Sequence, residues 1–173
     1  MKSINVIIPA FNEEKSIGHV IRDIPKIVDE IIVVNNNSTD NTQEVAEETG
    51  ATVVFEKRKG YGYSCLKGIE YLNNQDKEPD IVVFLDGDFS DFPKELIPIT
   101  EPILNGSVDF VLGSRVKKLR EKGSMTPQQV FGNWLACFLM RILYKSNFTD
   151  LGPFRAIKWD TLIDLNMVDK TYG

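Results

Sequence analysis

The chain has 173 residues, with 20 Lys or Arg against 25 Asp or Glu, so its formal net charge is −5. This length suits one domain with a sizeable core, and the 42% hydrophobic fraction is that of a folded globular protein. The acidic balance argues against a nucleic-acid-binding protein. Two widely separated cysteines exclude a disulfide framework and a zinc knuckle, and the first residues lack a signal peptide, so we expect a cytoplasmic protein.

Short apolar runs alternate with amphipathic segments from the first residues onward. Strands are predicted at residues 4–8, 31–34, 51–55, 81–85 and 108–112, and helices at residues 17–24, 39–49, 61–73 and from about 93. The runs predicted as strands are apolar throughout, which is typical of strands covered by helices on both faces. The alternation therefore predicts an α/β fold with a mostly parallel sheet, and Asn12 is expected to cap the first helix.

The last third of the chain opens with a helix signal. Thr126, Pro127 and Gln129 stand where a capping residue, a first helical residue and the partner of a capping box belong. The apolar run that follows is shorter than the roughly 20 residues that a membrane-spanning helix needs. A strand at residues 154–157 and a short helix at residues 161–165 complete the predicted elements.

Residues 115–122 hold five basic residues and one glutamate, a net charge of +4 in an acidic chain. Anionic lipids attract such segments, so we expect peripheral attachment at the inner face of the membrane through this segment. The apolar helix after it is expected to be buried against the sheet, and the alternative is a helix that lies in the membrane interface.

Polar residues gather where the predicted strands end, and ligands of parallel α/β sheets bind at that edge. Asp86 and Asp88 give the sharpest signal, because two carboxylates one residue apart after a buried strand repel each other unless a cation lies between them. Such hard oxygen ligands suit Mg²⁺ or Mn²⁺, whose coordination is commonly completed by substrate phosphates. The alternative is a solvated Asp-Gly turn.

Together these segments resemble the family 2 glycosyltransferases, which have the GT-A fold. The resemblance extends in order along the whole chain and rests on residues 9–14 (Pro-Ala-Phe-Asn-Glu-Glu), 33–42, 59–62, 84–88 and 112–115. Residues 150–156, Asp-Leu-Gly-Pro-Phe-Arg-Ala, are similar to a stretch of the family's dolichyl- and polyprenyl-phosphate sugar transferases. The resemblance implies a single Rossmann-like GT-A catalytic domain over residues 1–173, in which a carboxyl-terminal portion of the family's domain is expected to be lacking or not shown.

The resemblance further implies a UDP- or GDP-sugar donor, a divalent ion held by Asp86 and Asp88, and inversion at the anomeric carbon of the sugar. The residues that it places around the donor are Pro9, Phe11, Glu13, Val34, Asn36, Lys59, Asp86 and Gly87. Position 36 is frequently acidic in the family and reads the base, and the Asn36 amide could both donate to and accept from a base edge. The alternative is that residues 35–38 form only a turn and a helix cap.

The residues expected to act in sugar transfer are Asp88, Asp150, Arg115 and Arg155. The two arginines are expected to bind phosphate oxygens, and the alternative is that they form structural ion pairs. A lipid-phosphate acceptor is already ionised and needs no base, whereas a hydroxyl acceptor needs a carboxylate, for which Asp150 is the candidate. The sequence leaves both acceptors open, and it leaves the oligomeric state unknown.

Two other functions compete with this interpretation. A sugar-phosphate nucleotidyltransferase would normally show a Gly-rich phosphate-binding loop after its first strand, and residues 9–12 are not such a loop. The second is a nucleotide-binding module without catalysis. Isothermal titration with a panel of nucleoside diphosphates, with and without Mn²⁺, would narrow the choice among these functions.

Overall fold

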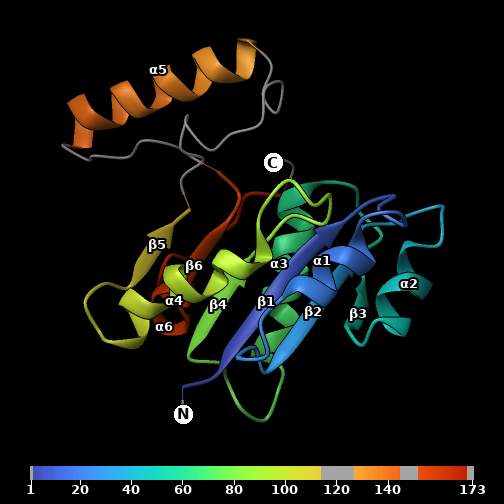
Figure 1. Cartoon of the computed structure of the whole chain (residues 1–173). Coiled ribbons are helices and arrows are strands. Elements are labelled where there is room, and N and C mark those ends of the chain that lie inside the picture. Colours follow the sequence, from blue (N-terminus) through green and yellow to red (C-terminus); the bar gives the residue numbers. More distant parts are fainter. Residues whose placement is uncertain (1, 114–126, 145–151, 171–173) are drawn as a thin grey trace. The chain divides into compact units, whose positions relative to one another are not determined.

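The computed structural model describes residues 2–113, 127–144 and 152–170. The chain divides into two units (Figure 1). Residues 1–111 and 154–173 form the unit that contains the sheet, and residues 112–153 form the unit that contains helix α5 (Pro127–Tyr144). Each unit is described by itself.

The described residues form a six-stranded sheet in the order β3-β2-β1-β4-β6-β5 (Figure 1). The strands are β1 (Ile4–Ala10), β2 (Glu30–Asn35), β3 (Thr52–Phe55), β4 (Ile81–Phe84), β5 (Phe110–Leu112) and β6 (Arg155–Lys158). β1 pairs in parallel with β2 and β4, and β2 with β3, whereas β6 runs antiparallel to β4. The predicted mostly parallel α/β sheet is confirmed, and β6 enters it out of chain order, between β4 and β5.

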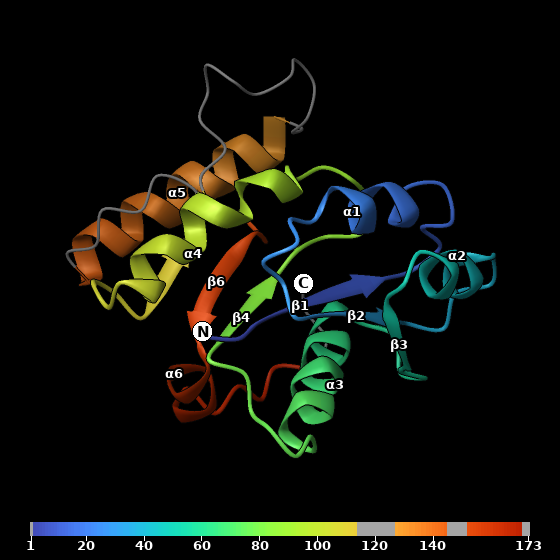
Figure 2. The same ribbon diagram turned by 60° about the horizontal axis from the view of Figure 1, so that its bottom comes forward.

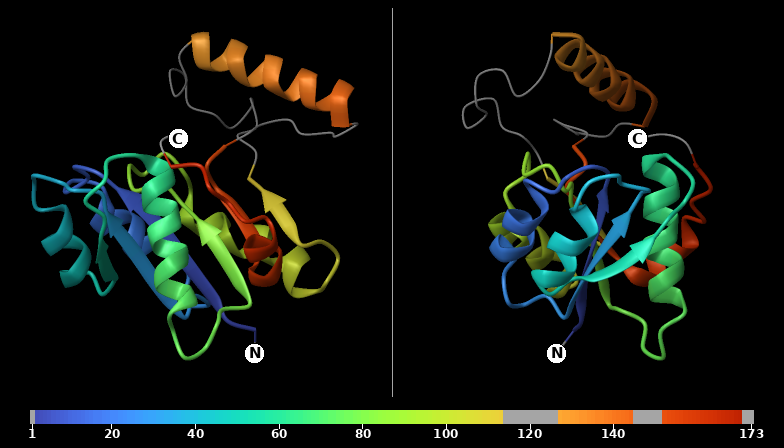
Figure 3. Two further views of the ribbon diagram at one scale, coloured as in Figure 1. Left: turned by 180° about the vertical axis from the view of Figure 1, so that it is seen from behind. Right: turned by 90° about the vertical axis from the view of Figure 1, so that its right-hand side faces the viewer.

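Helices cover both faces of this sheet (Figures 2 and 3). One face carries α1 (Ile17–Asp23), α2 (Thr42–Glu48), the short 3-10 turn η1 (Pro93–Glu95) and α4 (Leu96–Leu104). The other face carries α3 (Tyr61–Asn73) and α6 (Trp159–Asp164). Both faces are therefore apolar, which explains why the strands show no alternation of polar and apolar residues.

The pleat of β1 divides its side chains between two cores. Ile4, Val6 and Ile8 pack with α1 and α4, whereas Ile7 packs with α3. At Gly68 of α3 a methyl group would lie 2.6 Å from Ile7 Cγ2, a distance that van der Waals repulsion forbids. Gly68 thus allows α3 to pack closely on the central strand, and α3 begins where the functional residues gather.

One predicted cap and one predicted helix start differ from the structure. Asn12 does not cap α1, because α1 begins at Ile17 and Asn12 lies in the preceding loop with a left-handed φ of 58°. The second helix begins at Thr42 and not near residue 39, because residues 38–41 form hydrogen bonds with the loop after β1. Asn12 and residues 38–41 therefore form hydrogen bonds between the loops after β1 and β2, in place of the expected Asn12 cap and the first turn predicted for the second helix.

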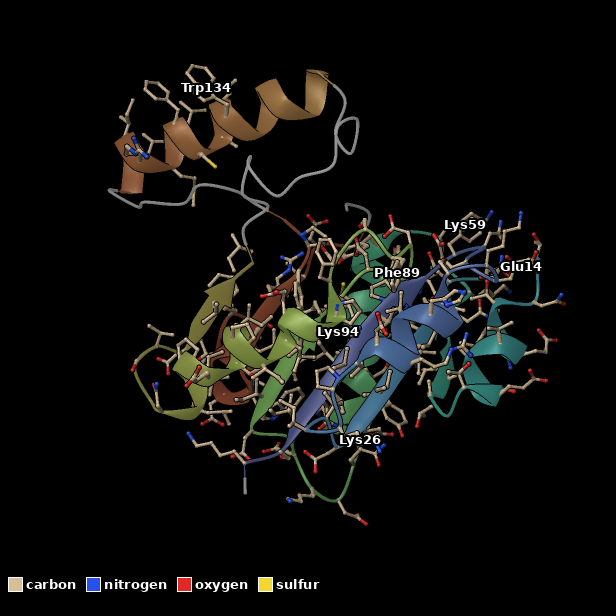
Figure 4. All side chains as sticks on the ribbon, viewed as in Figure 1. Glu14, Lys26, Lys59, Phe89, Lys94 and Trp134 are labelled. Atoms are coloured by element: carbon tan, nitrogen blue, oxygen red, sulfur yellow. The ribbon has the colours of Figure 1, made fainter. Side chains whose placement is uncertain are left out.

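Helix α5 has an apolar stripe. Its exposed apolar side chains are Trp134, Leu135, Phe138, Leu139, Ile142 and Leu143. The rings of Trp134 and Phe138, one turn apart, are stacked with their centroids 5.6 Å apart (Trp134 is labelled in Figure 4). No helix in the described part of the chain combines the length and apolar character needed to cross a bilayer. Packing of α5 against the sheet stays a prediction.

Candidate functional site

The candidate site is a pocket of about 470 Å³ at the carboxyl ends of β1, β2 and β4. β1 lies between β2 and β4, so the order of the parallel strands reverses there, and ligands of open α/β sheets bind at such a reversal. Figure 4 shows Lys59 and Glu14 at this end of the sheet and Lys26 at the opposite end. The pocket is lined by Pro9, Ala10, Phe11, Glu13, Asn36, Lys59, Gly60, Tyr61, Ser64, Asp86, Gly87 and Asp88.

Two loops, one after β1 and one after β2, are joined by reciprocal hydrogen bonds. The backbone N–H groups of residues 12, 13 and 14 donate to Ser38 Oγ, Thr42 Oγ1 and Asp40 Oδ2, at 3.1, 2.7 and 3.2 Å. Each acceptor is a side chain of the second loop or of the first residue of α2. Three backbone donors that would otherwise need water are thereby satisfied within the protein.

Hydrogen bonds also run in the opposite direction. The Thr39 N–H donates to Asn12 Oδ1 at 2.9 Å, and the Asn41 N–H donates to Glu14 Oε2 at 3.1 Å. We call these five bonds between residues 12–14 and residues 38–42 the loop clamp. Because Phe11 and Glu13 lie in the first of the two loops, the loop clamp fixes one wall of the pocket.

The loop between β3 and α3 carries the basic side of the pocket. Glu56 is buried, and its carboxylate accepts from the Arg58 Nε and terminal nitrogen at 2.8 and 2.7 Å. Arg58 also lies over the Tyr63 ring, at 4.4 Å. Lys59 is directed differently: its Nζ lies over the Phe11 ring, 4.8 Å from the ring centre, and both side chains line the pocket. Of the two neighbouring cations, Lys59 is therefore the one that lines the site.

Asn36, at the end of β2, is 7% exposed. Its side-chain amide forms hydrogen bonds with backbone groups of the same β3–α3 loop. Asn36 therefore lines the pocket while its amide binds the protein's own backbone, which differs from the expected arrangement in which the amide is presented to a base.

Asp86, Gly87 and Asp88 follow β4 and line the pocket. Asp86 is half-buried and Asp88 is exposed, and Asp88 Oδ1 accepts from the Ser90 N–H at 2.9 Å. That bond orients the carboxylate and leaves Oδ2 to bind a cation. In the described residues no group of three or more acidic, histidine or cysteine ligands gathers. Two carboxylates fit a Mg²⁺ or Mn²⁺ ion whose other ligands are water and substrate phosphates.

Arg155, the first residue of β6, pairs in register with Phe84 of β4, and its guanidinium lies 5.9 Å from the Phe84 ring centre. It also lies near Tyr61 and Cys65 of α3. Burial raises the pKa of Tyr61 and raises that of the Cys65 thiol to about 12, although the positive charge of Arg155 opposes both shifts. Both groups are therefore uncharged near neutral pH, and Arg155 is a positive charge near them.

The structure brings most of the predicted donor-binding residues together. Those that line the one pocket are Pro9, Phe11, Glu13, Asn36, Lys59, Asp86, Gly87 and Asp88. Val34 does not line it, because its side chain is buried in the core that β2 shares with α3. Arg155 is not among the lining residues, and Arg115 and Asp150 lie outside the described residues.

The sequence analysis missed Tyr61 and Ser64, which line the pocket from the first turns of α3. The available signal was the position of Gly60 and Tyr61 within the motif at residues 59–62.

The residues of the pocket also lie within the region that matches known proteins. The sequence profile described as glycosyl transferase family 2 matches residues 5–163, which include both loops of the clamp and Asp86–Asp88. A crystal structure of glucosyl-3-phosphoglycerate synthase from Mycobacterium tuberculosis, in complex with Mn²⁺, UDP-glucose and phosphoglyceric acid, matches with a TM-score of 0.73 at 26% identity. That match covers 93% of this chain and 58% of the synthase, and it confirms the expected GT-A fold.

Two relatives in sequence are longer than this chain. The UDP-N-acetylglucosamine–dolichyl-phosphate N-acetylglucosaminyltransferase of Methanococcus voltae is 29% identical over 168 residues, which cover 86% of this chain and 66% of that protein. The low-salt glycan biosynthesis hexosyltransferase Agl6 of Haloferax volcanii is 28% identical over 170 residues, which cover 92% of this chain and 40% of that protein. The chain thus spans less than two thirds of either relative.

The Glu56–Arg58 pair makes stability depend on pH. The Arg58 hydrogen bond outweighs burial and lowers the pKa of Glu56 from 4.5 to about 2. A lowered pKa stabilises the fold above the unfolded-state value of 4.5, and this stabilisation is lost as the pH falls toward 2. We expect Glu56→Gln to lower the free energy of unfolding near neutral pH and to make its fall in acid shallower. Urea unfolding at about pH 7, 5 and 3 measures this.

The exposed Glu78→Gln variant is the control for the loss of one carboxylate. A Glu56→Gln protein whose stability follows the wild-type curve at every pH would contradict the assignment.

Proposed function

Because the chain belongs to glycosyl transferase family 2, we propose that its pocket binds a nucleotide-diphosphate sugar and that the protein transfers the sugar to an acceptor with inversion at the anomeric carbon. The observation that carries the proposal is the convergence of Phe11, Lys59, Asp86 and Asp88 on one pocket. An aromatic face suits a nucleobase, and a carboxylate pair suits the divalent cation that accompanies a diphosphate.

Each side of the pocket has a distinct task in this proposal. Phe11 and Lys59 hold the nucleoside, and Asp88, with support from Asp86, holds Mg²⁺ or Mn²⁺ through Oδ2, the oxygen that does not accept from Ser90. When bound, the ion would neutralise the charge that develops on the departing nucleoside diphosphate. The Mn²⁺ and UDP-glucose bound to the M. tuberculosis synthase support Mn²⁺ and UDP as the first ligands to test, with GDP as the alternative.

The acceptor proposed first is a polyprenyl or dolichyl phosphate. The name of the M. voltae relative supports it, and the resemblance of residues 150–156 to lipid-phosphate transferases points the same way. Arg115 and Arg155 would then bind phosphate oxygens, and the ionised acceptor would need no base. A hydroxyl acceptor is the alternative, and it would require Asp150 as general base.

Metal-coupled nucleotide binding tests the proposal. Asp88→Asn removes one negative ligand but keeps the size of the side chain, so we expect UDP affinity in Mn²⁺ to fall by at least about 10-fold and affinity in EDTA to change little. Isothermal titration of UDP under both conditions measures the effect. Asp76→Asn, in the exposed α3–β4 loop at the other end of the sheet, is the matched control.

Equal UDP affinities of wild type and Asp88→Asn in Mn²⁺ would exclude the metal role of Asp88. Failure of the wild type to bind UDP or GDP under any condition would contradict the proposed function itself.

The proposal includes peripheral attachment to an anionic membrane surface. Two features support it: the net charge of +4 over residues 115–122, and the apolar stripe of α5, which is available to a membrane if α5 does not pack on the sheet. Each basic residue near an anionic surface contributes on the order of 1 kcal/mol, and an apolar stripe can lie in the interface without spanning it. Attachment of this kind would bring the protein to a lipid-phosphate acceptor.

Co-sedimentation with liposomes tests this attachment. We expect binding to vesicles that contain anionic lipid, weaker binding at high salt, and loss of binding when Lys117, Lys118 and Arg120 are changed to Ser. The control changes three exposed lysines elsewhere, Lys15, Lys26 and Lys77, to Ser. Salt-resistant binding would assign attachment to α5, and the absence of binding to either kind of vesicle would contradict attachment and favour a soluble acceptor.

A further inference from the structure

The side chain of Asn36 is almost fully buried between the end of β2 and the β3–α3 loop. Its Nδ2 donates to two backbone carbonyl oxygens, that of Glu56 at 3.3 Å and that of Arg58 at 2.6 Å. Its Oδ1 accepts from the backbone N–H of Gly60 at 2.9 Å. One amide thus binds three backbone groups within a five-residue loop.

The polarity of these three partners requires an amide. Two carbonyl oxygens can only accept and a backbone N–H can only donate, so the Nδ2 and Oδ1 positions follow from the partners themselves. Both donor positions of Nδ2 have carbonyl partners in the loop, and Oδ1 accepts from the Gly60 N–H. A carboxylate of the same shape would place an oxygen against two carbonyl oxygens, which repel it.

The loop held by Asn36 ends at the residues that line the pocket. Gly60, whose N–H donates to Asn36, has a φ of 138° and directly precedes the first residue of α3. Lys59 lies between two of the residues anchored by Asn36, and its Nζ faces the Phe11 ring. The direction of Lys59 therefore depends on the anchoring of Arg58 and Gly60.

We infer that Asn36 is a positioning residue that holds the β3–α3 loop so that Lys59 lies over the Phe11 ring at the pocket, and that it does not read the base. This inference rests on the proposed function, because Lys59 and Phe11 are the side chains expected to hold the nucleoside. The role of Asn36 is then to hold the loop that carries Lys59, and not to form hydrogen bonds with the base. Base preference then arises at other groups of the pocket.

Asn36→Asp tests the inference, because it preserves shape and removes the two donors. Asn35→Asp is its matched control: Asn35 Oδ1 accepts from the Ser38 N–H, which a carboxylate keeps, and its Nδ2 donates to Oε1 of the exposed Gln43, a bond outside the β3–α3 loop. We expect amide exchange of Gly60 to speed up at least about tenfold in Asn36→Asp and to stay at the wild-type rate in Asn35→Asp.

This exchange measurement uses the protein without nucleotide, so it remains valid if the proposed function fails. Should Asn36→Asp not fold, Asn36→Ala removes the same donors without adding a charge, and the same acceleration is expected. Wild-type exchange of Gly60 in the variant that folds would overturn the inference.

Titration with UDP, GDP and CDP in Mn²⁺ then separates positioning from base reading. A positioning role predicts that Asn36→Asp weakens all three nucleotides by the same factor, so that their affinity ratios are unchanged. It also predicts that Lys59→Met weakens UDP binding in the wild type and adds nothing in the Asn36→Asp background. A change in the affinity ratios, or additive effects of the two substitutions, would overturn it.

Discussion

The hydrogen bonds of the loop clamp are the constraint on which the rest of the site depends. The loops after β1 and β2 are joined by backbone donors of one and side-chain acceptors of the other, in both directions. Asn12 and Asn37 take left-handed conformations, with φ of 58° and 61°, that asparagine tolerates better than most residues. The polar motif at residues 38–42 therefore shapes the wall that carries Phe11 and Glu13, and the ligand-facing residues lie beside it.

A second constraint sets the charges of the pocket. The β3–α3 loop has three consecutive basic residues, of which Arg58 is engaged by Glu56 and Tyr63 while Lys59 faces Phe11. Asp86 and Asp88 supply negative charge from the end of β4. Lys59 and the Phe11 ring suit the nucleoside of a nucleotide-diphosphate sugar. Asp86 and Asp88 suit the metal ion that accompanies its diphosphate. The parallel strand ends bring these two pairs of residues together although they are far apart in the sequence.

The sequence predicted the strand ends well, because apolar runs that stop at polar motifs mark them directly. It therefore located Phe11, Lys59 and the Asp86–Asp88 pair in one pocket. Val34, which the resemblance places around the donor, is buried in the core that β2 shares with α3, and in a strand covered on both faces the apolar pattern does not show which face a residue joins. The sequence also could not show the backbone partners of Asn36, since these depend on how a loop some twenty residues later folds back on β2.

The most direct test of this account is hydrogen exchange at the amides of residues 12–14, Thr39 and Asn41, with and without UDP and Mn²⁺. The loop clamp is expected to exist before any ligand binds, because its donors and acceptors all belong to the protein. We therefore expect slow exchange of these amides in the protein alone, unchanged by ligand. Fast exchange in the protein alone, with protection appearing only when UDP and Mn²⁺ are present, would contradict this expectation.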